Sequence, residues 1–144
     1  MNLQKNTLYA LYSVLESASR PEQKMSTGEI ARSYGVSPHH LAKVMRVLVR
    51  AKLVASVRGV GGGYQFTGNA KRLTLLDVID LFERIGAPER GPVAQRRGRG
   101  AGIERALDTI FSEIDEISRA TLRSISIATM LKLIERQRRL KSTP

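Results

Sequence analysis

The sequence predicts a mainly α-helical fold that contains one small β-hairpin. Apolar residues recur at three- and four-residue steps in several segments, which is the periodicity of amphipathic helices. A glycine-rich run at 59–63 separates two short segments that contain valine, tyrosine and phenylalanine, as in a hairpin. The chain has 144 residues, 42% of them hydrophobic, which suits one packed domain with an appended helical arm.

Two helices are predicted at the start of the chain. Residues 6–18 have one apolar face, and Pro21 follows that segment and closes it. Ser26 and Glu29 have the spacing of a capping box, which opens a second helix. That helix ends near Gly35, a residue suited to the left-handed conformation at a helix end.

A third helix follows at once. Ser37 suits its N-cap and Pro38 its first position, and the apolar pattern reaches about Lys52. Two short helices joined by a tight turn that contains glycine form a helix-turn-helix motif.

A β-hairpin is predicted next, with strands at 53–58 and 64–66 and a flexible loop at 59–63. A hairpin directly after a helix-turn-helix motif is the wing of a winged helix-turn-helix domain. Thr74 and Asp77 then form a second capping box, which opens a fourth helix that runs to Ile85.

The remaining residues are predicted to form a loop and two helices. Residues 86–102 are rich in Gly, Pro and Arg, which is typical of a flexible basic loop. A long helix follows, whose heptad-like apolar seam predicts dimerisation through Ile103, Leu107, Ile110, Ile114, Ile117 and Thr121. Ser126 caps a last helix, with Met130, Leu131, Leu133 and Ile134 facing inward. The expected organisation is a winged helix-turn-helix domain at 1–85, the loop at 86–102, and the dimerisation and C-terminal helices at 103–144.

The charge favours an anionic partner. Lys and Arg number 24 against 13 Asp and Glu, a net charge of +11, so nucleic acid is the leading expectation and a membrane surface is the competitor. The predicted helix-turn-helix motif and wing narrow the expected partner to double-stranded DNA. No apolar stretch is long enough to span a membrane and no signal-peptide pattern opens the chain, so we expect a cytoplasmic, nucleoid-associated protein. The absence of cysteine excludes disulfides and thiol chemistry.

The predicted DNA contacts lie on the helix-turn-helix motif and the wing. Residues in the N-terminal half of a recognition helix reach base edges, whereas Arg46 and Arg50, further along, suit phosphate. Arg58 suits the minor groove, and the glycines beside it permit close approach to phosphate. The candidate DNA-binding residues are Ser26, Thr27, Ser37, His39, His40, Lys43, Arg46, Arg50, Arg58, Gly59, Gly61, Gly62 and Tyr64. A solvated helix face and a plain hairpin turn are the simpler alternatives for these two elements.

The glycine run does not match either of two common nucleotide-binding motifs. A phosphate-binding P-loop needs Lys followed by Ser or Thr after its last glycine, and the dinucleotide fingerprint needs a glycine at position 64. Tyr64 stands at that position, so neither motif is present.

Residues 56–64 match the pattern S-x-R-G-x-x-G-G-Y, and in this respect the chain resembles the wing of the Rrf2 family of transcription regulators. Weaker matches agree in order at 9–11, 30–31, 53–54 and 75–79, and the resemblance covers roughly residues 3–134. It implies a dimeric winged-helix regulator whose long helix crosses that of its partner.

The sequence departs from the family's sensor members. Sensor members of the family that this chain resembles hold an iron–sulfur cluster through three cysteines in the loop before the dimerisation helix. Here that loop, 86–102, contains no cysteine, and His39 and His40 belong to the predicted recognition helix. We therefore expect a cluster-free member, with neither a cofactor nor a metal.

The same loop carries Arg90, Arg96, Arg97 and Arg99 instead. These arginines could contact flanking DNA phosphate, bind an anionic effector or a protein partner, or form a solvated charge run.

An enzyme is not expected. Asp77, Asp80 and Glu83 recur at steps of three, and carboxylates at that spacing usually form a solvated face or pair with helix dipoles. No catalytic or metal-ligand spacing accompanies the two histidines.

The sequence thus predicts a sequence-specific DNA-binding transcription regulator that acts as a homodimer on a palindromic operator, with repression as the expected sign. An effector, either a small molecule or a protein, is left open. The alternatives are a non-specific architectural or RNA-binding protein and a protein-interaction module built on the long helix.

Overall fold

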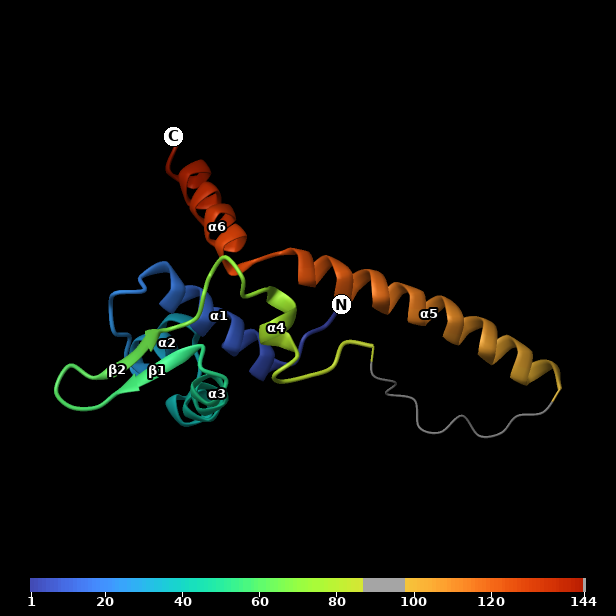
Figure 1. The fold of residues 1–144 in the computed structure, drawn as a ribbon, viewed down its shortest axis with the longest axis horizontal. Coiled ribbons are helices and arrows are strands. Elements are labelled where there is room, and N and C mark those ends of the chain that lie inside the picture. The colour runs from blue at the N-terminus through green and yellow to red at the C-terminus, as the bar shows by residue number, and fades with distance from the viewer. Residues whose placement is uncertain (87–97, 144) are drawn as a thin grey trace.

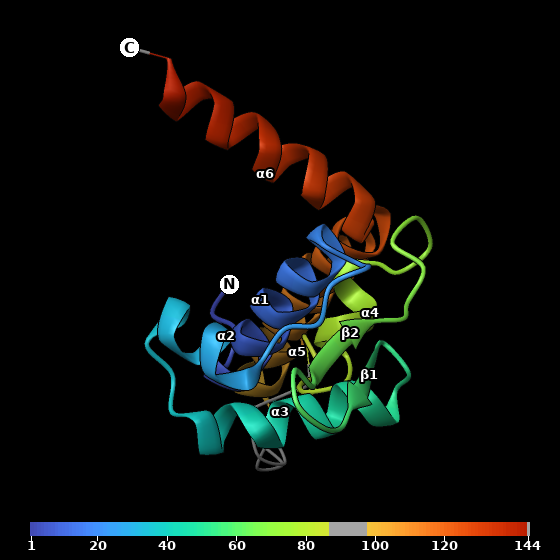
Figure 2. The same ribbon diagram turned by 90° about the vertical axis from the view of Figure 1, so that its left-hand side faces the viewer.

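The computed structural model describes residues 1–86 and 98–143, and it confirms a mainly helical fold with one β-hairpin (Figure 1). The elements in chain order are α1 (Lys5–Ser19), α2 (Thr27–Tyr34), α3 (Pro38–Arg50), β1 (Val54–Val57), β2 (Gly63–Phe66), α4 (Leu75–Ile79), α5 (Arg99–Ser124) and α6 (Ile127–Ser142). Elements α1 to α4 form a winged-helix unit, from which α5 and α6 project in two directions (Figures 1 and 2).

The hydrophobic core surrounds α1, which packs against α3, α4, α6 and β2. Its fully buried side chains come from every part of the winged-helix unit, among them Val14, Leu41, Leu48, Val54 and Ile79. Ile127, in the first turn of α6, belongs to the same core and is also fully buried. The start of α6 is therefore an integral part of the winged-helix unit.

The helix-turn-helix motif forms largely as predicted. The hydroxyl oxygen of Ser26 accepts a hydrogen bond from the Glu29 amide at 3.1 Å, and Gly35 closes α2 with a φ of 64°. Ser37 occupies the N-cap position of α3 as predicted, but its side chain makes no capping hydrogen bond. Helix α3 ends at Arg50 rather than near Lys52, because Lys52 has a φ of 63° and turns the chain toward β1.

The hairpin is antiparallel, with Val54 opposite Phe66 and Val57 opposite Gly63. Its strands differ from the predicted ones by a residue at several ends, since pairing begins at Val54 and Gly63 already belongs to β2. Met25 forms a further bridge with Tyr64 through two backbone hydrogen bonds of 2.8 Å. The base of the wing is thus joined to the residue just before the α2 cap.

Helix α4 is shorter than predicted. The capping box between Thr74 and Asp77 is present, but the helix ends at Ile79 instead of continuing to Ile85. The Phe82 amide bonds to the Ile79 carbonyl in a tighter turn, and the Glu83 carboxylate accepts a bond from the Gln4 amide at 2.7 Å. This contact with the start of α1 lies far away in the sequence, so local periodicity could not indicate it.

The helices after the loop also differ from the prediction at one end. Helix α5 begins at Arg99 instead of Ile103, so the predicted loop at 86–102 is too long at its C-terminal end. Ser126 caps α6 as predicted, by accepting from the Thr129 amide at 3.1 Å. Leu131 packs against the core, but Leu133 is 46% exposed and the prediction that it faces inward is wrong.

A joint fixes α5 and α6 to the winged-helix unit. The Leu75 amide donates to the Ile125 carbonyl at 3.0 Å, and the Ile127 amide donates to the Leu73 carbonyl at 2.8 Å. Nearby, the Arg119 guanidinium donates two hydrogen bonds of 3.1 Å to the two carboxylate oxygens of Asp80. The C-terminal end of α5 is therefore held, while its N-terminal part extends away from the unit (Figure 1). None of the helices in the described ranges has the length and apolar character needed to cross a membrane.

Candidate nucleic-acid interface

Helix α3 has one buried face and one exposed polar face. Leu41, Val44, Met45 and Leu48 are buried against the winged-helix unit. The opposite face carries the exposed side chains of Ser37, His39, His40, Lys43, Arg46 and Arg50. The prediction placed these six residues together, and the structure brings them onto one continuous surface.

The hairpin loop lies next to this face. In Figure 1 the loop between β1 and β2 projects at the lower left of the winged-helix unit and α3 lies at its bottom, and in Figure 2 both lie at the lower edge. A single duplex could therefore meet both elements, with the N-terminal half of α3 in its major groove.

The loop contains a hydrogen-bonded turn. The Gly62 amide donates to the Gly59 carbonyl at 2.9 Å, which closes a four-residue turn, and Gly61 has the positive φ of 74° that such a turn favours. A Cβ atom on Gly62 would lie 2.4 Å from the Val57 carbonyl oxygen, so the turn excludes any side chain there. Arg58 is exposed beside this turn.

Three other predicted contacts lie at the base of the wing. The Ser26 hydroxyl is engaged in the cap of α2, and Thr27 is half-buried as the first residue of that helix. Tyr64 pairs with Met25 and its side chain packs against the core. These residues support the wing and the helix-turn-helix motif through contacts within the chain.

Val60 was not among the candidate contacts, and it stands at the tip of the turn with its side chain completely exposed. It is the single non-glycine residue in the run 59–63.

The three carboxylates at steps of three have structural partners. Asp77 completes the α4 capping box, and Glu83 accepts hydrogen bonds from the Gln4 amide and the Thr7 hydroxyl at the start of α1. Asp80 binds Arg119, and this hydrogen bond raises the pKa of the Arg119 guanidinium. The three side chains point to different elements and do not converge on a common reaction centre.

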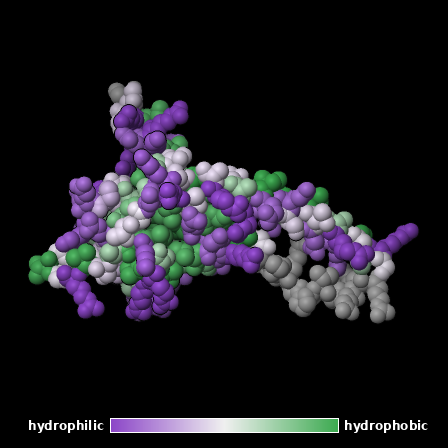
Figure 3. All heavy atoms as spheres, in the orientation of Figure 1, coloured by the Kyte–Doolittle hydropathy of each residue, from purple (hydrophilic) through white to green (hydrophobic). Residues whose placement is uncertain are grey.

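The predicted dimerisation seam is exposed in the single chain. Ile103, Leu107, Ile110, Ile114 and Ile117 are between 47% and 66% exposed. Thr121 is exposed as well, and its hydroxyl donates to the Ile117 carbonyl at 2.9 Å. Hydrophobic side chains accordingly line the upper edge of α5 in the space-filling view (Figure 3). Phe111, which is 41% exposed, lies next to the seam and was not predicted as part of it.

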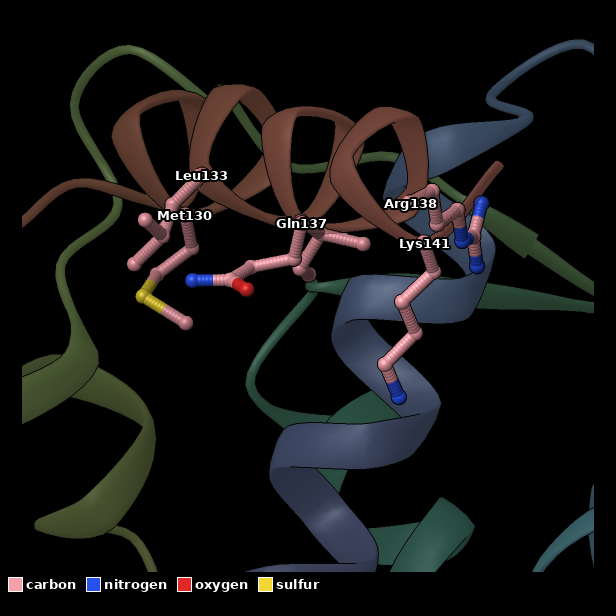
Figure 4. Close-up of a pocket in the computed structure, with 6 residues that line it drawn as sticks. Met130, Leu133, Gln137, Arg138 and Lys141 are labelled. Carbon is pink, nitrogen blue, oxygen red and sulfur yellow. The ribbon is translucent and has the colours of Figure 1, made fainter. Parts of the chain in front are cut away.

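A shallow hollow lies along α6 (Figure 4). It is mainly apolar, with two cationic side chains toward the C-terminal end of the helix. Its lining consists of Met130, Leu133, Ile134, Gln137, Arg138 and Lys141.

The arginine-rich loop is only partly covered by the structure. Arg90, Arg96 and Arg97 lie outside the described residues. Arg99 is exposed at the first position of α5.

Comparison with known proteins gives concordant results. The Rrf2 family, described as iron-dependent transcriptional regulators, matches residues 3–133. BadM of Rhodopseudomonas palustris, whose name assigns it to the HTH-type transcriptional regulators, is 50% identical over 139 residues, 96% of this chain and 86% of that protein. Protein aau3 of Rhizobium meliloti is 36% identical over 119 residues, 77% of each chain.

Solved structures share the fold. IscR of T. potens has a TM-score of 0.67 and 25% identity, with 95% of this chain and 90% of that chain covered. CymR of B. subtilis, described as the global cysteine regulator, has a TM-score of 0.68 and 23% identity, with 92% and 98% covered.

The donor atoms of this chain do not fit an iron centre of the kind that the family description implies. The sequence has no cysteine, and its two histidines are adjacent on the exposed face of α3. Within residues 1–86 and 98–143, no three His, Asp or Glu side chains group as metal ligands would.

Three observations agree with one another: the family match along residues 3–133, the 50% identity with BadM, and the winged-helix fold with a long exposed α5. The chain belongs to the Rrf2 family and is a transcriptional regulator with a DNA-binding winged-helix fold.

Proposed function

We propose that this chain represses transcription as a homodimer that binds a palindromic operator with sequence specificity, in the cytoplasm and on the chromosome. The observation that carries the proposal is the exposed polar face of α3 beside the wing, at one edge of the molecule. Occupation of an operator by such a dimer would exclude other proteins from the same DNA.

Helix α3 supplies the direct readout. Ser37, His39 and His40 lie at its N-terminal end, where a recognition helix comes closest to base edges. Lys43 follows one turn later and suits the acceptor atoms of guanine. Arg46 and Arg50 are exposed further along the same face and suit the phosphates that flank the groove.

The wing supplies a second contact. Arg58 is exposed next to the closed turn at 59–62, and an arginine on a thin hairpin can enter the minor groove, where the negative potential is strongest when the groove is narrow. The glycines on both sides of the tip allow the backbone to approach phosphate closely.

The exposed seam on α5 supports dimerisation. Five large apolar side chains on one helix face leave a surface that a second copy of α5 would cover. A two-fold dimer would present two copies of α3, so we expect half-sites about 34 Å apart and an inverted repeat.

Regulation would not proceed through an iron–sulfur cluster, because the chain lacks thiolate ligands. An effector, a small molecule or a protein, would act instead. The arginines of the loop before α5 would bind it or contact flanking DNA, and the hollow on α6 offers a second place for an apolar, anionic effector.

Selection of bound duplexes from a random DNA pool tests the proposal. We expect the wild type to recover an inverted repeat. Arg58→Ala should bind it more weakly, and the slope of log K against log salt should fall by about 0.9 for each phosphate that the variant no longer neutralises. Arg136→Ala, which removes one exposed charge on α6, is the matched control and should retain the affinity.

The opposite result is equally clear. Equal binding to all duplexes, with no consensus, would reject sequence-specific regulation and favour the architectural alternative driven by the charge of +11.

A further inference from the structure

The tip of the wing carries an apolar side chain that is completely exposed. Val60 is the most exposed large hydrophobic residue of the described chain, and its neighbours on both sides are glycines. In the space-filling view, the end of the molecule that carries the β1–β2 loop terminates in hydrophobic atoms (Figure 3). The fold does not account for Val60, because its side chain contributes nothing to the buried core.

The turn places this side chain at its corner. The hydrogen bond from Gly62 to Gly59 encloses Val60 at the second position of a four-residue turn, followed by Gly61 with its positive φ. Side chains at the corner of such a turn project outward. The antiparallel pairing from Val57–Gly63 to Val54–Phe66 and the bridge to Met25 then connect the tip to the core. Val60 therefore stands at the corner of a hydrogen-bonded turn that the paired strands connect to the core.

We propose that Val60 enters the minor groove together with Arg58 and makes the regulator select A·T pairs at the flank of each half-site. This inference rests on the DNA binding proposed above and names a specificity-determining residue for it. The chemical reason is the floor of the groove. Guanine places its N2 amino donor there, whereas A·T pairs present only acceptors and an unobstructed floor. A valine cannot accept a hydrogen bond from that amino group. The amino group of a G·C pair would therefore lose its bound water without gaining a hydrogen bond from the protein.

Arg58 and Val60 would have separable roles. The arginine supplies attraction to phosphate and to the groove potential, which depends on salt. The valine supplies an apolar contact, so its replacement should change base preference without changing the salt slope. Apolar wedges are a known device of minor-groove readers, and a short branched side chain fits a groove about 6 Å wide.

Operator duplexes with altered flanking pairs test the inference. The flank is varied among A·T, G·C, inosine·C, which lacks the minor-groove amino group, and diaminopurine·T, which adds it. We expect the wild type to bind the A·T and inosine·C duplexes alike, and to bind the other two about five- to tenfold more weakly. This order follows the minor-groove amino group and not the major-groove face, which inosine·C shares with G·C.

Two variants assign the effect to Val60. Val60→Ala should lose most of the preference while retaining the salt slope. Val60→Thr has nearly the same volume, but its hydroxyl can accept from guanine N2, so it should bind all four duplexes with similar affinity. Since Val60 is completely exposed, both variants should unfold at the wild-type temperature.

Several results would overturn the inference. The wild type could bind all four duplexes equally, it could separate A·T from inosine·C, or Val60→Ala could keep the full preference. Each of these leaves the proposed function intact if the inverted repeat is still recognised. Failure of the wild type to bind any operator duplex would reject both proposals.

Discussion

At the scale of single residues, polar side chains of types that also occur in catalytic sites stabilise the winged-helix unit. Tyr34, at the end of α2, is a clear example. Its hydroxyl donates to the Glu16 carboxylate at 2.6 Å, and its ring stacks on Tyr12 with centroids 4.4 Å apart. Burial, followed by the hydrogen bond to Glu16, raises the pKa of Tyr34 above its ordinary value. The phenol therefore stays protonated as long as this contact exists.

This contact predicts a loss of stability at alkaline pH. Above about pH 10 the unfolded chain releases the tyrosine proton while folded Tyr34 retains it, so the free energy of unfolding falls as pH rises. Denaturant titrations across this range should show that the free energy of unfolding falls less steeply with pH in Tyr34→Phe than in the wild type. The difference in slope corresponds to at most one proton. Glu16→Gln keeps an acceptor but removes the charge, and it should give an intermediate slope. Identical slopes for the wild type and Tyr34→Phe would contradict the assignment.

At the scale of secondary-structure elements, two serines in the same N-cap position have different roles. The Ser26 hydroxyl accepts from the Glu29 amide, whereas the Ser37 side chain makes no capping bond and is exposed on the α3 face. Pro38 has no amide hydrogen at the first position of α3, so the start of this helix has one unsatisfied donor fewer. Ser37 therefore remains available for an external partner.

This difference is measurable. Ser26→Ala should lower the free energy of unfolding by about 1 kcal/mol, because it leaves an amide at the start of α2 unsatisfied. Ser37→Ala should leave stability nearly unchanged and weaken operator binding instead. Urea unfolding monitored by circular dichroism and DNA titration separate the two effects. Equal losses of stability in both variants would show that the two caps are equivalent.

At the scale of the whole molecule, the joint and the seam on α5 decide how two copies would present α3. The Arg119–Asp80 contact and the backbone bonds around Ile125 hold the end of α5 against the winged-helix unit. Through this joint, the pairing geometry of two α5 helices would set the separation of two α3 helices. Dimerisation and half-site spacing are thus properties of the same arrangement.

A charge placed in the seam should separate the two copies. Ile114→Glu, at a position 53% exposed in the single chain, should give a folded monomer in sedimentation velocity, because a carboxylate cannot be buried there unpaired. Loss of bivalency should weaken binding to the full inverted repeat by about a hundredfold or more. Ser112→Glu introduces the same charge on the exposed opposite face of α5 and should remain dimeric. A dimeric Ile114→Glu would refute the predicted seam.

Much of the fold was predictable because its signals are local. The Ser26–Glu29 and Thr74–Asp77 caps, the stop at Gly35 and the Ser126 cap each depend on residues within four positions of one another. Helical periodicity likewise predicted which face of α3 is exposed. The exposure of the candidate residues on α3 could be predicted for the same reason, and their role as DNA contacts stays a prediction.

The remaining features depend on partners distant in the sequence. Glu83 lies beyond the end of α4 and accepts a hydrogen bond from the start of α1, and Tyr64 pairs with Met25. Leu133 remains exposed because α6 contacts the core mainly through its first turn. The hydrogen-bonded turn that carries Val60 also needed the structure, since a glycine run alone does not specify one backbone conformation. The sequence by itself determined the order of the elements, the helix caps and the charge, because these arise from neighbouring residues. Only the tertiary structure decided where α4 ends, what Glu83 and Tyr64 do and how the wing tip is held, because those outcomes follow from contacts between segments that fold together.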